Sequence, residues 1–284
     1  MHKTLLTLAM LQLFSSVAVA QESTVPTPTD ELPADLRKKV RRAESTLGVD
    51  FKIHLDDPLS TPNRRIQTGP VDYSLASRAL PRVVRHLSFY PKAVRTELVS
   101  EIHLIGKLRM RGKPFLGVAR PKTGRFDLAI RPRTTARKLA HTFHHEFAHL
   151  IEGRPEFDRA AWEAISGKEA YAGTTHRTAY PGQSYLRAGF VNPYAARDSH
   201  EDFAELLELA ISDPAQVNRL AARHDKIGQK LDILQETYAS LHPRMPIPGE
   251  TPLLGREAMK AHRKAKRIER RERRQERRRQ SRAG

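Results

Sequence analysis

The stretch from Thr135 to Gly153, TARKLAHTFHHEFAHLIEG, places the strongest constraint on how this 284-residue chain can fold. It predicts a single helix, because Thr134 or Thr135 can cap its start and Gly153 can end it. At 100° per residue its large apolar side chains fall on one arc: Leu139, Phe143, Phe147, Leu150 and Ile151. His145 and His149 lie on the roughly opposite arc. The fold must therefore bury one face of this helix in a core and open the other to a cleft.

The spacing of the polar residues on this helix also indicates chemistry. His145 and His149 are four residues apart, so both imidazoles leave the same face and can bind one ion. Glu146 lies between them, where it can deprotonate a metal-bound water. Because the chain contains 13 His, the pattern can also arise by chance on a surface helix with two solvated histidines. The rest of the sequence has to decide between these interpretations.

The order of elements before this helix predicts the fold class. Asp56–Pro70 is loop-like, and the helix predicted over Asp72–Phe89 is interrupted or kinked at Pro81. The other predicted helices are Leu36–Leu47 and Pro91–Val99, and the predicted strands are Phe51–Leu55, Glu101–Leu108, Phe115–Ala119 and Arg125–Ile130. Strands followed by a metal-binding helix predict an α+β, zincin-like lobe with a small mixed sheet and a helical C-terminal part.

Regular patterns fade between Arg154 and Pro193, where the predicted structure is a loop-rich insertion. Insertions of this length in compact domains are typical of binding-site walls or disordered segments. Its aromatic residues favour a wall, although they can equally be ordinary core anchors. They are Trp162, Tyr171, Tyr180 and Tyr185.

A second informative stretch follows, in which Glu201–Ile211 is predicted to be a helix with Ser199 as its N-cap and Asp213-Pro214 as its end. Its apolar face contains Phe203, Leu206, Leu207 and Ala210, and the helices that follow are expected within Asp213–Ala239. Glu201, Glu205 and Glu208 share another side, as they would on a solvated face. A catalytic zinc site, however, needs three protein ligands and one open position. Glu201 is the best candidate for the third ligand, and Glu205 is placed to orient a ligand from the second coordination shell.

Two further histidines are alternative members of such a site. His141 precedes His145 by four residues and lies on the same side, but a helix rises about 6 Å over that interval. A second-shell or solvated position is therefore favoured over direct ligation. His200 could replace Glu201 as a ligand, yet it points about 100° away on the same helix.

Together these residues resemble a known family. His145-Glu146-Phe147-Ala148-His149, then Tyr194, then Glu201-Asp202-Phe203-Ala204-Glu205 is similar to the metallopeptidase domain of the anthrax lethal factor-like gluzincins. That group has a Tyr seven residues before its Glu ligand, as here (201 − 194 = 7), and the 52 residues from His149 to Glu201 (201 − 149) suit it. The resemblance covers roughly Leu104 to Ile211.

The resemblance implies a zinc-dependent metalloendopeptidase that acts on a peptide or protein substrate. One Zn²⁺ per chain would be held by His145, His149 and Glu201, with an open position for water. Glu146 would act as the general base on that water, and the Tyr194 hydroxyl would help stabilise the oxyanion that forms. The strand at Phe115–Ala119 is a candidate for binding extended substrate by edge pairing.

The N-terminal residues predict export. Met1 to Ala20 has a short positive start, an apolar run and an Ala-Val-Ala site, as in a signal peptide cleaved after Ala20. A retained N-terminal anchor is the alternative. No later stretch is apolar enough to suggest a membrane span, and the absence of Cys excludes disulfides and lipoprotein attachment. We therefore expect a secreted or periplasmic protein.

The predicted domain organisation places a linker and basic helix at 21–46, the metallopeptidase domain at 47–245, and a Pro-rich linker and basic tail at 246–284. Arg256–Gly284 contains 14 Lys and Arg and 4 Glu, so +10 of the net charge of +18 lies there. It is a solvated tail, disordered or helical, or a tether to anionic surfaces and polyanions. A non-catalytic metal-binding protein and a polyanion-binding envelope protein are the alternatives to the enzyme.

Overall fold

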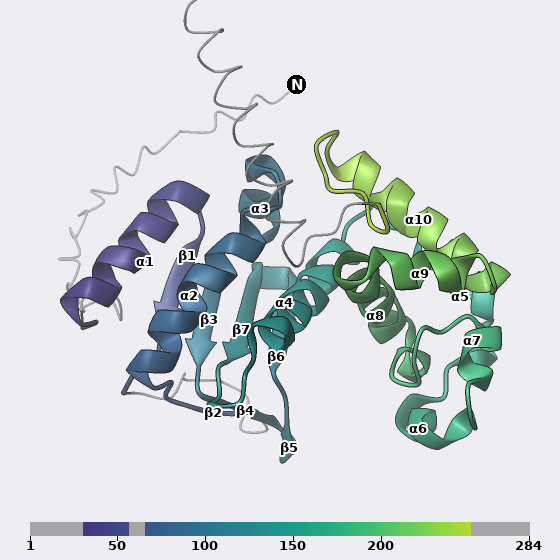
Figure 1. Cartoon of the computed structure of the whole chain (residues 1–284), viewed down its shortest axis with the longest axis horizontal. Coiled ribbons are helices and arrows are strands. Elements are labelled where there is room, and N and C mark those ends of the chain that lie inside the picture. The colour runs from purple at the N-terminus through teal and green to yellow at the C-terminus, as the bar shows by residue number, and fades with distance from the viewer. Residues whose placement is uncertain (1–30, 57–65, 251–284) are drawn as a thin grey trace, which may run out of the picture.

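The computed structural model describes residues 31–56 and 66–250, and a four-stranded mixed sheet forms the centre of its N-terminal half (Figure 1). The strand order is β1-β3-β7-β6, in which β3 pairs in parallel with both β1 and β7 and β6 runs antiparallel to β7. The bounds are Asp50–Ile53 for β1, Glu101–Ile105 for β3, Gly117–Arg120 for β6 and Arg125–Ala129 for β7. Strand β6 is thus an edge strand, and it borders the helix that follows β7.

A second, antiparallel sheet contains three short strands: β2 (Ile66–Gly69), β4 (Lys107–Met110) and β5 (Lys113–Pro114). The single strand predicted over Glu101–Leu108 is therefore wrong, because β3 and β4 belong to different sheets. The chain passes between them at Gly106, where an added Cβ would lie 1.9 Å from the carbonyl oxygen of Pro70. Strand β2 also replaces part of the predicted loop.

Helices α1 (Ala34–Leu47), α2 (Tyr73–Leu87), α3 (Lys92–Leu98) and α4 (Ala136–Ile151) complete this half of the molecule. The carboxylate of Asp72 caps α2 by accepting from the amides of Ser74 and Leu75. The helix continues through Pro81 rather than being interrupted there. Pro81 is exposed, and burial of the apolar face on either side of it offsets the missing hydrogen bond.

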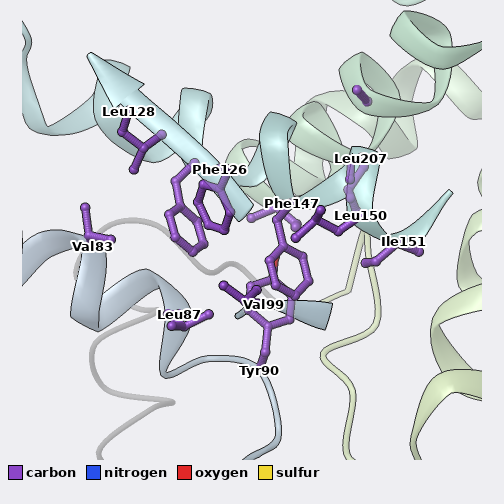
Figure 2. Packing of buried hydrophobic residues seen from close by; sticks show 14 of the residues in the cluster. Val83, Leu87, Tyr90, Val99, Phe126, Leu128, Phe147, Leu150, Ile151 and Leu207 are labelled. Atoms are coloured by element: carbon purple, nitrogen blue, oxygen red, sulfur yellow. The ribbon is translucent and has the colours of Figure 1, made fainter. Parts of the chain in front are cut away.

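One core joins the sheet to the helices (Figure 2). The rings of Tyr90 and Phe147 stack with centroids 3.8 Å apart, and Phe126 packs edge-on against Phe143. The apolar arc predicted for the helix is confirmed, since all five of its residues are buried: Leu139, Phe143, Phe147, Leu150 and Ile151. Each such side chain contributes about 1.5–3 kcal/mol on burial, which fixes the rotation of α4 and turns its His-bearing face away from the core.

The C-terminal half is helical, which confirms the α+β class (Figure 1). Asp198, rather than the predicted Ser199, caps α8 by accepting from the amide of Glu201. Trp162 is fully buried in the segment expected to be loop-rich, so this aromatic residue is a core anchor. The helices are α5 (Arg159–Ser166), α6 (His176–Ala179), α7 (Ser184–Ala188), α8 (Ser199–Ser212), α9 (Pro214–Ala221) and α10 (Asp225–Leu241).

Several predictions concern other parts of the chain. The signal peptide, the first part of the linker and the basic tail Arg256–Gly284 lie outside the described residues. The basic helix assigned to the N-terminal extension is α1, and its Leu36 and Val40 are buried in the common core. Across residues 31–56 and 66–250, no helix has the length and hydropathy needed to cross a membrane.

Candidate metal centre

Helices α4 and α8 pack against each other and bring two segments 52 residues apart into one site. His145 and His149 come from the last two turns of α4, and Glu201 comes from the first turn of α8. One ligand atom from each of the three lies within 4.8 Å of the other two. The Nε2 atoms of the two histidines are 3.3 Å apart, and Oε2 of Glu201 is 3.1 Å from Nε2 of His145 and 3.9 Å from Nε2 of His149.

Two further carboxylates determine which nitrogen of each imidazole faces this centre. Nδ1 of His145 is 3.1 Å from Oε1 of Glu205, and Nδ1 of His149 is 3.3 Å from Oε1 of Glu152. A carboxylate accepts a hydrogen bond, so each Nδ1 carries a proton and donates it. In the neutral rings, both Nε2 lone pairs then point toward Glu201, which is the arrangement of a metal-binding histidine oriented by an outer carboxylate.

The donor set fits a cation. Oε2 of Glu201 is buried and has no hydrogen-bond partner among the described residues. It faces two imidazole nitrogens whose lone pairs point the same way, so the three groups repel one another unless a positive charge lies between them. Two imidazoles and one carboxylate are ligands typical of catalytic zinc. His145, His149 and Glu201 could therefore hold a zinc ion.

The pKa shifts at the site reflect the same concentration of negative charge. Burial lowers the pKa of His145, but the neighbouring carboxylates of Glu201 and Glu205 outweigh burial and raise that pKa well above its usual value. Burial would raise the pKa of Glu201, yet His145, His149 and Tyr194 hold it at about 2. Glu201 thus remains an anion, which is the form that ligates a metal cation.

Glu146 lies on the inner side of the same helix turn, against the edge strand β6. Its side chain is buried, with only 6% of the residue exposed, and a Cβ added at Gly117 would lie 2.5 Å from its Oε1. Burial raises the pKa of Glu146, although the nearby charges of His145 and His149 oppose the shift. A carboxylate with a raised pKa accepts a proton more readily, as a general base must.

Tyr194 and Arg197 flank the other oxygen of Glu201. The Tyr194 hydroxyl donates to Oε1 of Glu201 at 2.9 Å, and one guanidinium nitrogen of Arg197 donates to that oxygen at 2.8 Å and to the Tyr194 hydroxyl at 2.9 Å. Burial, followed by the charge of Glu201, raises the pKa of Tyr194, so the phenol stays protonated. The site therefore contains two hydrogen-bond donors beside the proposed ligand.

The two alternative histidines do not join the set of three. Nδ1 of His141 is 2.5 Å from Oε1 of Glu208, one turn before the centre. His200 is 2.7 Å from Oε1 of Glu152, so both imidazoles contact carboxylates. The three glutamates that share a side of α8 thus face histidines of α4 rather than solvent.

Sequence reasoning missed Arg197, Glu152 and Asn192. Arg197 precedes Glu201 by four residues and Glu152 follows His149 by three, so helical spacing is a signal that could have indicated both. Asn192 donates to Oε2 of Glu205 at 2.6 Å from an irregular segment. No periodicity in the sequence indicates that contact.

Comparison with known proteins shows the family. Residues 122–264, or 143 of 284, match the family described as "Putative zinc-binding metallo-peptidase". The chain belongs to this family. The match includes every residue of the site except those of β6, and it agrees with the donor set found on α4 and α8. The predicted assignment to a zinc-binding metallopeptidase family is thereby confirmed at this level, whereas the lethal factor-like group is not the family that matches.

A solved structure supports the fold of this family member. It is a crystal structure of a "putative zinc-binding metallo-peptidase" from Bacteroides caccae, 20% identical, with a TM-score of 0.52. The alignment covers 74% of this chain and 88% of that one. At this identity the likeness concerns the fold alone. No curated protein matches the chain.

Proposed function

We propose that this protein is an exported, zinc-dependent metalloendopeptidase that hydrolyses peptide bonds in peptide or protein substrates. The observation that carries the proposal is the convergence of two Nε2 atoms and the unpartnered Oε2 of Glu201, next to the buried Glu146. One Zn²⁺ per chain, held by His145, His149 and Glu201, would supply Lewis acidity and lower the pKa of water from 15.7 to about 7.

The remaining chemistry belongs to side chains of this chain. Glu146 takes the proton of the attacking water and transfers it to the leaving amine when the C–N bond breaks. The carbonyl oxygen becomes an oxyanion, for which the Tyr194 hydroxyl and the Arg197 guanidinium are the available donors. Glu205 and Glu152 keep His145 and His149 in the tautomer and orientation that ligation requires.

Strand β6 is the proposed substrate-binding edge. It is the last strand of its sheet (Figure 1). Gly117 on this strand lies against Glu146. An extended peptide that pairs with the segment at Phe115–Ala119 would pass close to the proposed base. The resemblance to the lethal factor-like gluzincins is part of this proposal, and the hydrogen bond between Tyr194 and Glu201 supports it.

Two sequence features extend the proposal beyond the catalytic domain. The signal peptide ending at Ala20 supports secreted or periplasmic location. The charge of Arg256–Gly284 supports binding of the tail to an anionic surface or polyanion. Deleting that tail should weaken salt-sensitive binding to polyanions and leave peptide cleavage intact; the reverse result would favour a polyanion-binding protein.

The test combines metal analysis with cleavage of a peptide library. Wild-type protein should contain about one zinc per chain and cleave peptides, and Glu146→Gln should keep the zinc and lose cleavage. Glu236→Gln, exposed on α10, is the matched control and should behave as wild type. Failure of the wild type to bind zinc would overturn the proposal. Zinc binding with no cleavage by the wild type would favour the non-catalytic metal-binding alternative.

A further inference from the structure

A second site of a different character lies at the opposite end of α4. A cavity of about 260 Å³ opens between α2 and the loop that leads from β7 into α4. Four of its lining residues are arginines, and no acidic residue lines it. The arginines are Arg78 and Arg82 on α2 and Arg131 and Arg133 on the loop. Its volume is slightly below the range usual for drug-sized ligands, about 300–1,000 Å³, so the cavity suits a small charged group.

The positive charge of this cavity is not neutralised by any carboxylate of the described residues. Within residues 31–56 and 66–250, no carboxylate forms an ion pair with any of the four arginines. The pKa of Asp72 is lowered first by hydrogen bonds from Ser74 and Leu75 and last by the charge of Arg78, but this carboxylate caps α2 and is exposed. Clustered guanidinium groups repel one another. Concentration of Arg78, Arg82 and Arg133 around one cavity favours an anionic occupant.

Part of the cavity is already fixed in position. The guanidinium of Arg131 donates to the carbonyl oxygens of Phe115 at 2.6 Å and Leu108 at 3.4 Å, both outside the cavity lining, and so it anchors the loop that carries Arg133. The hydroxyl oxygen of Thr134 accepts from the amide of Arg131 at 2.9 Å, which leaves its proton for another acceptor. Helix α4, which is 16 residues long, begins at Ala136 in the cavity wall. Its positive end adds to the attraction for an anion.

From this arrangement we propose that the cavity binds a phosphate group, as the free ion or as an ester. Guanidinium groups form paired hydrogen bonds with phosphate oxygens, and the hydroxyl and helix terminus complement the same tetrahedral anion. Ala136 in the cavity wall lies nine residues before His145 along α4 (145 − 136), which is about 14 Å. The cavity is separate from the metal centre, and phosphate binding there does not depend on peptide hydrolysis.

The first experiment measures binding of inorganic phosphate to the full mature protein by titration calorimetry at constant ionic strength. Wild type should show saturable binding at one strong site. Arg82→Gln and Arg133→Gln should each weaken it by about tenfold, because one charge-assisted hydrogen-bonding partner is lost. Arg85→Gln is the matched control, since Arg85 is exposed on α2 and outside the cavity lining.

Two results would overturn the proposal: no saturable phosphate binding, or equal weakening by Arg82→Gln, Arg133→Gln and Arg85→Gln. Arg133 is exposed on a loop, so its variant keeps the test informative if Arg82→Gln does not fold. A second arm compares glycerol phosphate with vesicles of phosphatidylglycerol in phosphatidylcholine. If glycerol phosphate and the vesicles both bind and both depend on Arg82, a lipid headgroup can supply the phosphate group. If glycerol phosphate alone binds, the source is a soluble ester.

Discussion

The buried ion pair between Lys230 and Asp202 gives the sharpest prediction about what holds the metal-binding half together. Lys230 lies on α10 and Asp202 lies on α8 directly after Glu201, and both side chains are only 1% exposed. Nζ of Lys230 is 2.6 Å from Oδ2 of Asp202. Trp162 and Tyr171 donate to the same oxygen at 2.9 Å each, so this carboxylate joins three segments of the chain.

Replacing Lys230 with Met keeps most of the side-chain volume and removes the charge. Asp202 then loses its only cationic partner among the described residues while two neutral donors remain. Burial raises the pKa of Asp202 to about 6 even with Lys230 opposing the shift, which shows how strongly the site disfavours an unpaired anion. Breaking a buried pair in this way costs about 3–5 kcal/mol. At 2–4 °C per kcal/mol, the melting temperature should fall by roughly 6–20 °C.

Thermal unfolding followed by circular dichroism, on chelator-treated protein, measures this effect without a contribution from bound metal. Lys226→Met is the matched control, because Lys226 lies one turn earlier on α10 and makes only a 3.4 Å hydrogen bond to the carbonyl of Ser166. The double variant Asp202→Asn/Lys230→Met should recover part of the loss. The reasoning fails if Lys230→Met melts within about 2 °C of Lys226→Met.

Three further predictions concern the site and its support. Gly117→Ala should reduce peptide cleavage by about a hundredfold while zinc is retained, because the new Cβ displaces Glu146; metal analysis beside the cleavage rate checks this, and unchanged cleavage would contradict it. Glu205→Gln should weaken zinc binding by about 10–100-fold in a chelator competition, and Glu208→Gln, which contacts only His141 among the α4 histidines, should not. Burial lowers the pKa of His86 from 6.5 to about 4, so the unfolded chain binds the proton more readily. Burial of neutral His86 therefore costs no free energy of unfolding above pH 6.5, and this free energy falls by about 3 kcal/mol as the pH approaches 4. A His86→Phe variant with the same pH slope in urea unfolding would refute this.

The elements that the sequence predicted well are those whose signal is local. Helix α4 combines a Thr cap with an apolar arc of helical period, and its bounds agree within two residues of the prediction. Strand β7 and helix α3 were predicted from short, clear patterns. The errors lie where distant segments decide. β3 and β4 form one apolar run in the sequence, yet they belong to different sheets, and the chain between them passes close to Pro70 at Gly106.

The residues of the site also divide into those placed by local helix geometry and those placed by packing between helices. His145, Glu146 and His149 lie on adjacent turns of one helix, so their relative positions follow from helical geometry. That Glu201 meets them depends on how α8 packs against α4. The same packing also decides what Glu152, Asn192 and Arg197 contact.

By itself, then, the sequence determined a helix with an apolar face, a pair of histidines four residues apart, a base between them and an acidic helix further along. Tertiary structure alone decided that Glu205 and Glu152 orient the two rings, that Glu201 presents an unpartnered oxygen to both, and that four arginines surround one cavity. Hydrogen bonds and apolar period within a helix are local, so they can be read along the chain. Contacts between helices depend on which buried surfaces fit together, and no spacing in the sequence specifies that fit.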